Sequence, residues 1–282
     1  THPFKGKGND AYALTYSTLA SIAKYPCASI GGKEKDVIYR KKYGFFQSEQ
    51  EAFKRIATEL QLKQVLDKPL IYKRHPLVYL VEAADDICYT IIDLEDAHRL
   101  KILTYEEVKN FLLPFSNDDK IEERLKQDYD NDAKIGLLRA KAINTLTRVC
   151  AQIFYEQQEL LLSGDMNHSL TNCLPEPYAK AWEEIEKVSI KKIYNYSSVI
   201  QKEVAGYKVM AGLLEEFVPA LINNDTHYYK KLVKLIPQQF LTDDEDIYSK
   251  IQSVLDFVSG MTDLYAVDLY SKVKGTSFPV IS

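Results

Sequence analysis

The sequence has few of the residues that build cross-linked or metal-stabilised small proteins. No two of its four cysteines are spaced as a CxxC pair, so we expect neither a disulfide framework nor a structural zinc site. No run of about 18 apolar residues occurs, so no membrane-spanning helix is predicted, and no signal peptide is recognisable. Gly6-Lys7-Gly8 lacks the rest of a phosphate-binding loop and is interpreted as an ordinary loop. These absences favour a cytoplasmic protein without a membrane anchor.

What is present is the composition of a folded globular chain, with 46% hydrophobic and 27% charged residues among 282. The net charge of −4 argues against a broad nucleic-acid surface but leaves room for a local basic pocket. Tyrosine is abundant, and some of its 20 rings could stack on a ligand. The chain begins Thr1-His2-Pro3 without an initiator methionine, so we expect a fragment or a processed product.

Hydrophobic residues recur at helical spacing along most of the chain, which predicts an all-α, multi-helix bundle. A strand is conceivable only over residues 36–46, and the turn-rich segment 163–175 is a candidate subdomain boundary. Thr104 with Glu107, and Thr242 with Glu245, have the spacing of helix-capping pairs. Helices are expected near residues 11–25, 48–62, 76–100, 104–113, 133–162, 178–188, 190–202, 203–222, 226–236 and 242–274.

The helix expected over 76–100 carries the most distinctive polar pattern. Asp85, Tyr89 and Asp93 are spaced at i, i+4 and i+8 and therefore lie along one edge of that helix. Such an edge could bind a metal and a ligand with hydroxyl groups, although a merely solvated face is the simpler interpretation. The apolar stripe expected to be buried beside it consists of Leu77, Leu80, Val81, Ala84, Cys88, Ile91 and Ile92, and the acids expected on the solvated face are Glu82, Asp86, Glu95 and Asp96.

Two basic sites precede this acidic helix. Lys24-Tyr25 ends the first expected helix, and Arg40-Lys41-Lys42 lies in a loop. Each has a plain structural interpretation, since a lysine commonly caps a helix end and charge runs are usually solvated. Together they could also clamp a polyphosphate. His168, a lone loop histidine, is not expected to be a ligand.

Several motifs in register resemble the deoxyguanosinetriphosphate triphosphohydrolases of the HD-domain phosphohydrolase superfamily. The segment Glu82-Ala83-Ala84-Asp85-Asp86 occurs together with Ser259-Gly260-Met261-Thr262-Asp263-Leu264-Tyr265-Ala266, and that combination is specific. Three further motifs occur in the family's order and extend the resemblance over nearly the whole chain: Lys24-Tyr25-Pro26, Lys41-Lys42-Tyr43-Gly44 and Glu203-Val204-Ala205-Gly206-Tyr207.

The resemblance implies hydrolysis of a deoxynucleoside triphosphate (dNTP), dGTP in the type enzyme, to deoxynucleoside and triphosphate. It implies a divalent metal, Mg²⁺ or Mn²⁺, held by two histidines and two aspartates, of which the last aspartate maps onto Asp85. It also implies the substrate-binding residues, namely Tyr89 and Asp93 for the sugar, Lys24, Tyr25 and Lys42 for the phosphates, and Tyr194 with Glu203 for the base. Residues 1–115 would then be the part of the HD-type core that follows the HD motif, and 116–282 a helical region completing the pocket and the oligomer contacts.

The chain departs from the family at its defining residues. None of its five histidines is followed by aspartate, and the catalytic histidine–glutamate pair of the family has no counterpart here. One aspartate cannot hold a catalytic metal. We therefore expect the 282-residue chain to be inactive by itself and the intact protein to be active. The alternative is a catalytically degenerate module that binds nucleotides or serves oligomerisation.

The base preference and the assembly are expectations from the same resemblance. The segment 221–237 carries Lys230, Lys231 and Lys234 where the type enzyme has arginines, and lysine cannot make a bidentate contact. Guanine specificity is thus in doubt and a broader dNTPase is an alternative. The resemblance further implies a homo-oligomer, commonly a hexamer, and allows for a nucleic-acid or nucleotide effector.

Overall fold

The computed structural model describes residues 14–127 and 129–277. The loop expected at Gly6-Lys7-Gly8 and the first residues of the helix expected from position 11 lie outside these ranges. Chain contacts divide the described residues into a core unit, 14–196, and a C-terminal unit, 197–277. The division falls between Tyr196 and Ser197, whereas the functional division expected at 115/116 stays a prediction. The segment 163–175, expected at a boundary, lies inside the core unit instead.

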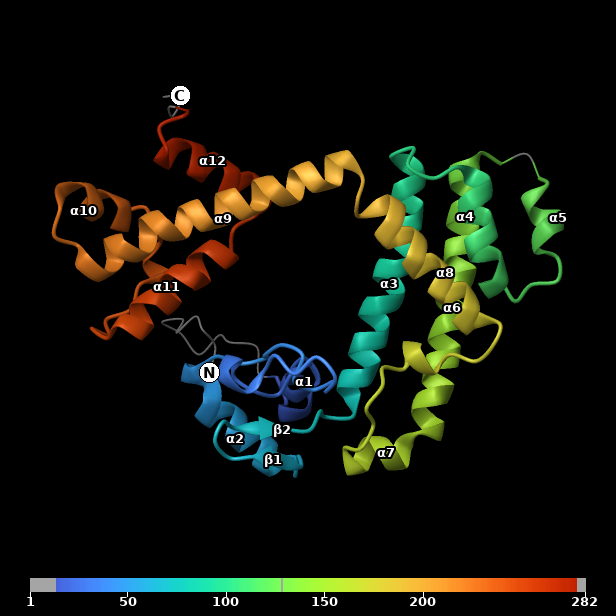
Figure 1. Ribbon diagram of the computed structural model, residues 1–282, viewed down its shortest axis with the longest axis horizontal. Helices are drawn as coiled ribbons and strands as arrows, with labels where there is room; N and C mark the ends of the chain where they lie inside the picture. The colour runs from blue at the N-terminus through green and yellow to red at the C-terminus, as the bar shows by residue number, and fades with distance from the viewer. Residues whose placement is uncertain (1–13, 128, 278–282) are drawn as a thin grey trace. The chain divides into compact units, whose positions relative to one another are not determined.

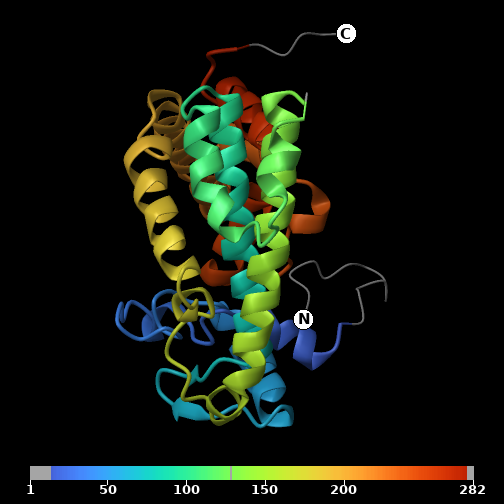
Figure 2. The same ribbon diagram turned by 90° about the vertical axis from the view of Figure 1, so that its right-hand side faces the viewer.

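Long helices dominate the core unit and confirm the all-α prediction. Helices α3, α4 and α6 pack side by side, and α8 packs against α4 (Figures 1 and 2). Their shared core includes Ile91 and Leu94 of α3 and Leu138 and Leu146 of α6, all fully buried. The helices of this unit are α1 (Tyr16–Ser21), α2 (Gln50–Glu59), α3 (Leu77–Arg99), α4 (Tyr105–Leu112), α5 (Ile121–Leu125), α6 (Asn131–Glu156), α7 (Gln158–Ser163) and α8 (Tyr178–Val188).

Short elements join these helices. One-turn 3-10 segments are η1 (Ser29–Gly31), η2 (Gln47–Glu49), η3 (Leu113–Phe115) and η4 (Thr171–Cys173), and a π-helical turn, η5 (Ser189–Ile193), follows α8. The only strands among the described residues are β1 (Gln64–Leu66) and β2 (Ile71–Tyr72), an antiparallel pair. The strand considered for 36–46 is therefore wrong, because that segment is built of turns. The β1–β2 pair escaped notice because its strands are too short to show alternation.

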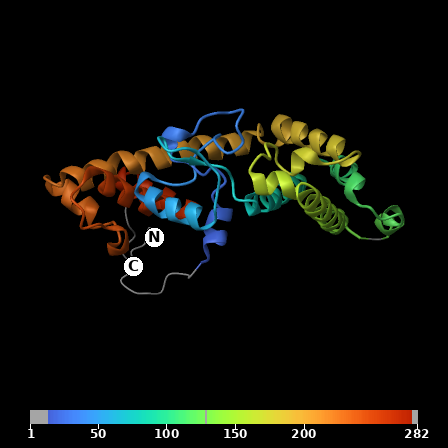
Figure 3. The same cartoon turned by 90° about the horizontal axis from the view of Figure 1, so that it is seen from below.

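The C-terminal unit is built on one long helix, α9 (Ser197–Asn223), against which α10 (His227–Val233), α11 (Ile247–Ser259) and α12 (Asp263–Val273) all pack (Figures 1 and 3). A 3-10 turn, η6 (Gln238–Phe240), precedes α11. The single helix expected over 242–274 is two helices, because Thr262 accepts a hydrogen bond from the backbone of Tyr265 and starts α12. The cap expected at Thr242 is likewise wrong, since Asp246 caps α11.

Capping of α4 follows the sequence closely. The side chain of Thr104 accepts from the backbone N–H of Glu107, and the carboxylate of Glu107 accepts from the backbone N–H of Thr104, as the spacing predicted. None of the helices in the described ranges has the length and apolar composition needed to cross a bilayer.

Candidate functional site

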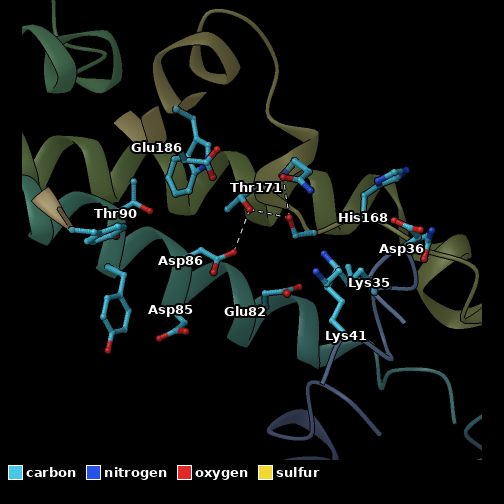
Figure 4. A pocket seen from close by; sticks show the side chains of 17 residues that line it. Lys35, Asp36, Lys41, Glu82, Asp85, Asp86, Thr90, His168, Thr171 and Glu186 are labelled. Atoms are coloured by element: carbon cyan, nitrogen blue, oxygen red, sulfur yellow. Dashed lines mark hydrogen bonds between the residues drawn. The ribbon is translucent and has the colours of Figure 1, made fainter. Parts of the chain in front are cut away.

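A pocket of about 700 Å³ runs along one side of α3 in the core unit (Figure 4). The loop around residues 35–41 borders one end of the pocket, and α8, which contributes Glu186, borders the other. The segment 167–172 faces α3 across it. The polar and aromatic residues that line the pocket are Lys35, Asp36, Lys41, Glu82, Asp85, Asp86, Tyr89, Thr90, Asn167, His168, Ser169, Thr171, Asn172, Trp182, Glu186 and Tyr194.

A buried ion-pair cluster fixes the end of the pocket near the loop. The carboxylate of Glu82, 8% exposed, lies 2.8 Å from Nη1 of Arg74 and 3.1 Å from Nζ of Lys24. Arg74 also donates to the backbone oxygens of Lys24 and Ile38, at 2.8 and 2.9 Å. A single guanidinium therefore joins α3 to the Lys24-Tyr25 segment and to the basic loop, and a desolvated carboxylate is stable there because it is doubly paired.

The pKa values of Lys24 and Asp86, at this end of the pocket, are shifted from their ordinary values. Burial is the largest single influence on Lys24 and lowers its pKa, but the hydrogen bond to Glu82 and the attraction of nearby negative charges, chiefly Glu82, together outweigh it, so the pKa of Lys24 is raised. The pKa of Asp86, one turn further along α3, is raised mainly by burial, against the lowering effect of Lys24. The hydroxyl of Thr171 donates to Asp86 at 3.3 Å.

These observations correct two sequence-based interpretations of α3. The acids assigned to a solvated face do not all lie there, because Glu82 and Glu95 are buried, Asp86 is half-buried and only Asp96 is exposed. Glu95 is paired with Arg99 of its own helix and with Arg139 of α6. The expected apolar stripe is also rotated. Ile91 is buried as expected and Leu80 is half-buried, but Leu77, Val81, Ala84, Cys88 and Ile92 are exposed. The other buried apolar positions include Val78, Tyr79, Ala83, Ile87 and Leu94.

The other end of the pocket is aromatic. The indole N–H of Trp182, a side chain that is 5% exposed, donates to the carboxylate of Glu186 at 3.0 Å, one turn along α8. The hydroxyl of Tyr194 donates to Asp93 at 2.9 Å. Burial, with that hydrogen bond as the next cause, raises the pKa of Tyr194 to about 12.

The pocket thus has two chemically different ends. In Figure 4, Lys35 and Lys41 lie beside Glu82, whereas Glu186 and Thr90 lie at the opposite end. Asp93 lies eleven positions after Glu82 in α3, a distance of about 16 Å along the helix axis at about 1.5 Å per residue. An elongated ligand with anionic groups at one end and a ring at the other matches this arrangement.

The structure brings several of the predicted site residues together. Asp85 and Tyr89 line the pocket, and both are exposed. Asp93 is linked to the pocket through Tyr194, and Lys24 through Glu82. These placements are compatible with the assigned roles, which stay predictions.

Other predicted residues lie elsewhere. The pocket wall contains Lys41 in place of its neighbour Lys42, and the ring of Tyr25 lies 5.6 Å from the guanidinium carbon of Arg74. Glu203 belongs to the C-terminal unit, where it is an exposed residue of α9. Its role in binding a base stays a prediction.

The sequence interpretation missed Trp182, Glu186 and the segment 167–172, including His168, which lines the pocket without any assigned role. The far wall of the pocket is the end formed by Trp182, Glu186 and Tyr194. Only the i, i+4 spacing of Glu186 and Trp182, the chain's single tryptophan, could have indicated it from the sequence.

A metal site is not complete within the described residues. No group of three or more histidine, cysteine, aspartate or glutamate side chains in 14–127 and 129–277 is arranged to hold an ion. Asp85 is one possible ligand, and its neighbour Asp86 is engaged by Thr171. The ligand set of residues 14–127 and 129–277 by itself does not fit a bound divalent metal.

Comparisons with known proteins cover both units. Residues 173–272 match the family model described as a phosphohydrolase-associated domain. The chain is 35% identical over 271 residues to a protein of Synechocystis sp. and 32% identical over 275 residues to one of Pseudomonas aeruginosa, both named deoxyguanosinetriphosphate triphosphohydrolase-like protein. It is 28% identical over 309 residues to the deoxyguanosinetriphosphate triphosphohydrolase of Cronobacter sakazakii.

These matches cover most of this chain but only part of each relative. They cover 94%, 94% and 92% of this chain but 60%, 61% and 60% of the three relatives, so the chain spans about three fifths of their length. The matches confirm the resemblance that the motifs indicated.

Proposed function

We propose, from the relation of this chain to the deoxyguanosinetriphosphate triphosphohydrolase-like proteins, that it forms part of an enzyme that hydrolyses a dNTP. The products would be the deoxynucleoside and inorganic triphosphate, with dGTP or a broader range of dNTPs as substrate. The observation that carries the proposal is the two-ended pocket along α3, with lysines at one end and aromatic side chains at the other.

At the lysine end, Lys35 and Lys41 would contact the phosphate groups. Lys24 would add its charge beside them, because the single carboxylate of Glu82 is shared between Lys24 and Arg74 and does not cancel both. Ammonium groups on flexible stems are suited to binding phosphate oxygens as point charges. Lys42 and Tyr25 remain proposed phosphate ligands by resemblance alone.

Further along α3, Tyr89 and Asp93 would bind the sugar. Tyr89 and Asp93 follow Asp85 by one and two helical turns. A nucleotide with its phosphates near Asp85 would therefore place its sugar beside Tyr89 and Asp93. Tyr194 would then stack on the base, with its hydroxyl already held by Asp93 at 2.9 Å.

Charge explains why nucleotide binding should depend on a divalent cation. Apart from Glu82, which is paired with Lys24 and Arg74, four carboxylates line the pocket against two lysines, so an accompanying divalent cation would favour binding of a polyphosphate. In the proposed enzyme, Mg²⁺ or Mn²⁺ would polarise the α-phosphate and activate water. Asp85 would be one ligand, and the others would come from outside the described residues.

The first test is triphosphate release from the four dNTPs with Mg²⁺ or Mn²⁺. We expect none from the 282-residue chain and clear release from a longer product of the same gene that contains a histidine and a His-Asp motif. Asp85→Ala in that product should reduce both metal binding and turnover by more than a hundredfold. Full activity of the Asp85→Ala protein would exclude the assignment of this residue.

A second candidate function is a degenerate module that binds nucleotides or serves oligomerisation. It is favoured by the lack of a complete metal-ligand group in residues 14–127 and 129–277. The two functions differ in one measurement, because a degenerate module would release no triphosphate from dNTPs in any form of the protein, whether it binds nucleotides or serves oligomerisation. A homo-oligomer, up to a hexamer, and an effector site are proposed with either function.

A further inference from the structure

The far wall of the pocket contains a carboxylate that is held in place and still has hydrogen-bonding capacity. Oε1 of Glu186 accepts the indole N–H of Trp182 at 3.0 Å. Trp182 itself is almost fully buried in the core of the unit, which makes it a rigid anchor. The other oxygen of Glu186 has no hydrogen-bond donor among the residues that the structure describes.

The surroundings of this carboxylate are those of a ring-binding site. Glu186 and Trp182 line the pocket together with Tyr89, Thr90 and Tyr194, so aromatic side chains come from both α3 and the segment after α8. In Figure 4, Glu186 lies at the end of the pocket opposite Lys35 and Lys41. A ligand whose phosphates occupy the lysine end would therefore place its ring system beside Glu186.

We propose that Glu186 is a specificity-determining residue that accepts N–H donors from the nucleobase, with Trp182 as its positioning residue. This inference rests on the proposed function and deepens it. An ionised carboxylate is an acceptor only, so it favours bases that present an exocyclic amino group. Guanine offers two adjacent donors, whereas adenine and cytosine each offer an amino group.

Thymine is the base that this wall disfavours. Its single ring N–H is flanked by two carbonyl oxygens, which repel a carboxylate. Thymine would therefore displace water from Glu186 without replacing the lost hydrogen bonds in full. A hydrogen bond to a charged group contributes about 1.5–3 kcal/mol, which corresponds to roughly ten- to a hundredfold in affinity. The chain should therefore bind dGTP, dATP and dCTP at least ten times more tightly than dTTP.

The experiment measures binding to the 282-residue chain in the presence of Mg²⁺. Calorimetric titrations give affinities for the four dNTPs and for inorganic triphosphate. The emission of Trp182, the only tryptophan in the chain, reports whether the base reaches the far wall. We expect the dNTPs with amino-bearing bases to change this emission and inorganic triphosphate to leave it unchanged.

Two variants on the same helix make the test specific. Glu186→Gln should lower the affinity for amino-bearing bases about tenfold and narrow their advantage over thymine, since an amide presents both a donor and an acceptor. Its affinity for inorganic triphosphate should not change. The matched control is Glu183→Gln, which alters another exposed glutamate of α8 whose partner is Lys187, and it should bind every ligand as the parent does.

The possible outcomes separate this inference from the proposed function. If inorganic triphosphate and all four dNTPs bind but the four bases are not distinguished, Glu186 does not select the base and the proposed function stands. The same holds if the dNTPs bind without changing Trp182 emission, or if Glu186→Gln keeps the parent's base preference. If neither triphosphate nor any dNTP binds, this inference fails, whereas the proposed function is decided by triphosphate release from the longer product.

Discussion

Removing the guanidinium of Arg74 should destabilise the core unit and disturb the lysine end of the pocket together. Arg74 is 3% exposed, and its side chain makes a 2.8 Å ion pair with Glu82 and hydrogen bonds to the backbone oxygens of Lys24 and Ile38. Arg74→Met keeps much of the side-chain length and removes all of these interactions. It leaves Glu82 buried, with Lys24 as its remaining partner.

The expected loss follows from what remains. Breaking a buried ion pair by deleting one partner costs about 3–5 kcal/mol, because the other charge stays desolvated. Lys24 lies 3.1 Å from Glu82 and still compensates part of that charge, so we expect a value near the lower limit, about 3 kcal/mol. The double variant Arg74→Met/Glu82→Leu removes both charges and should regain most of the loss.

Urea unfolding followed by Trp182 fluorescence measures this change, because Trp182 and Arg74 belong to the same unit. The inorganic triphosphate affinity of Arg74→Met should also fall, since Lys24 and the basic loop lose their common anchor. A loss of less than about 1 kcal/mol for Arg74→Met would refute the reasoning, because so small a value is typical of an exposed pair. A double variant less stable than Arg74→Met would refute it as well.

Two further predictions concern packing and pH. A Cβ atom added at Gly212 would lie 2.3 Å from Cε2 of Tyr270, so Gly212→Ala should destabilise the C-terminal unit by about 1–3 kcal/mol. Gly206→Ala, on the same helix with open space around it, should instead stabilise that unit by up to about 1 kcal/mol; hydrogen exchange of α9 distinguishes the two. Hydrogen bonds, chiefly from Lys192, lower the pKa of Glu107 from 4.5 to about 2, so its contribution is complete above pH 4.5 and is lost as the pH falls toward 2. Because the side chain of Glu107 is 35% exposed, Glu107→Gln should lower the free energy of unfolding by about 1 kcal/mol or less at pH 7 and by almost nothing at pH 2. Urea unfolding followed by Trp182 fluorescence at the two pH values measures the difference.

The sequence predicts local structure well where the residues of one helix suffice to define it, through their hydrophobic spacing and their capping residues. The helix expected over 178–188 is α8 with the same bounds, and the capping pair of Thr104 and Glu107 forms as its spacing indicates. Boundaries fail where a polar residue inside an apolar pattern starts a new helix, as Thr262 does. The far wall of the pocket was missed because Trp182 and Glu186 lie some ninety residues after the acids of α3, and no local pattern joins them.

For α3 itself, the order of polar groups along the helix axis could be predicted, but the rotation about that axis could not. The expected stripe through Leu77, Val81 and Ile92 and the observed stripe through Val78, Ile87 and Leu94 both satisfy helical spacing. Ile91 belongs to both stripes. Periodicity alone therefore cannot choose between them.

The choice depends on partners that lie outside the helix. Burying a carboxylate costs several kcal/mol unless a cation accompanies it. Arg74 precedes α3 and pairs with Glu82, while Arg139 of α6 pairs with Glu95, so each buried acid is matched by a cation. These pairs are compatible with burying Glu82 and Glu95, and that rotation directs Asp86 toward Thr171 while Asp85 stays exposed (Figure 4). Adjacent acids of one motif thereby acquire different environments, and only Asp85 remains open to a ligand supplied from outside the described residues.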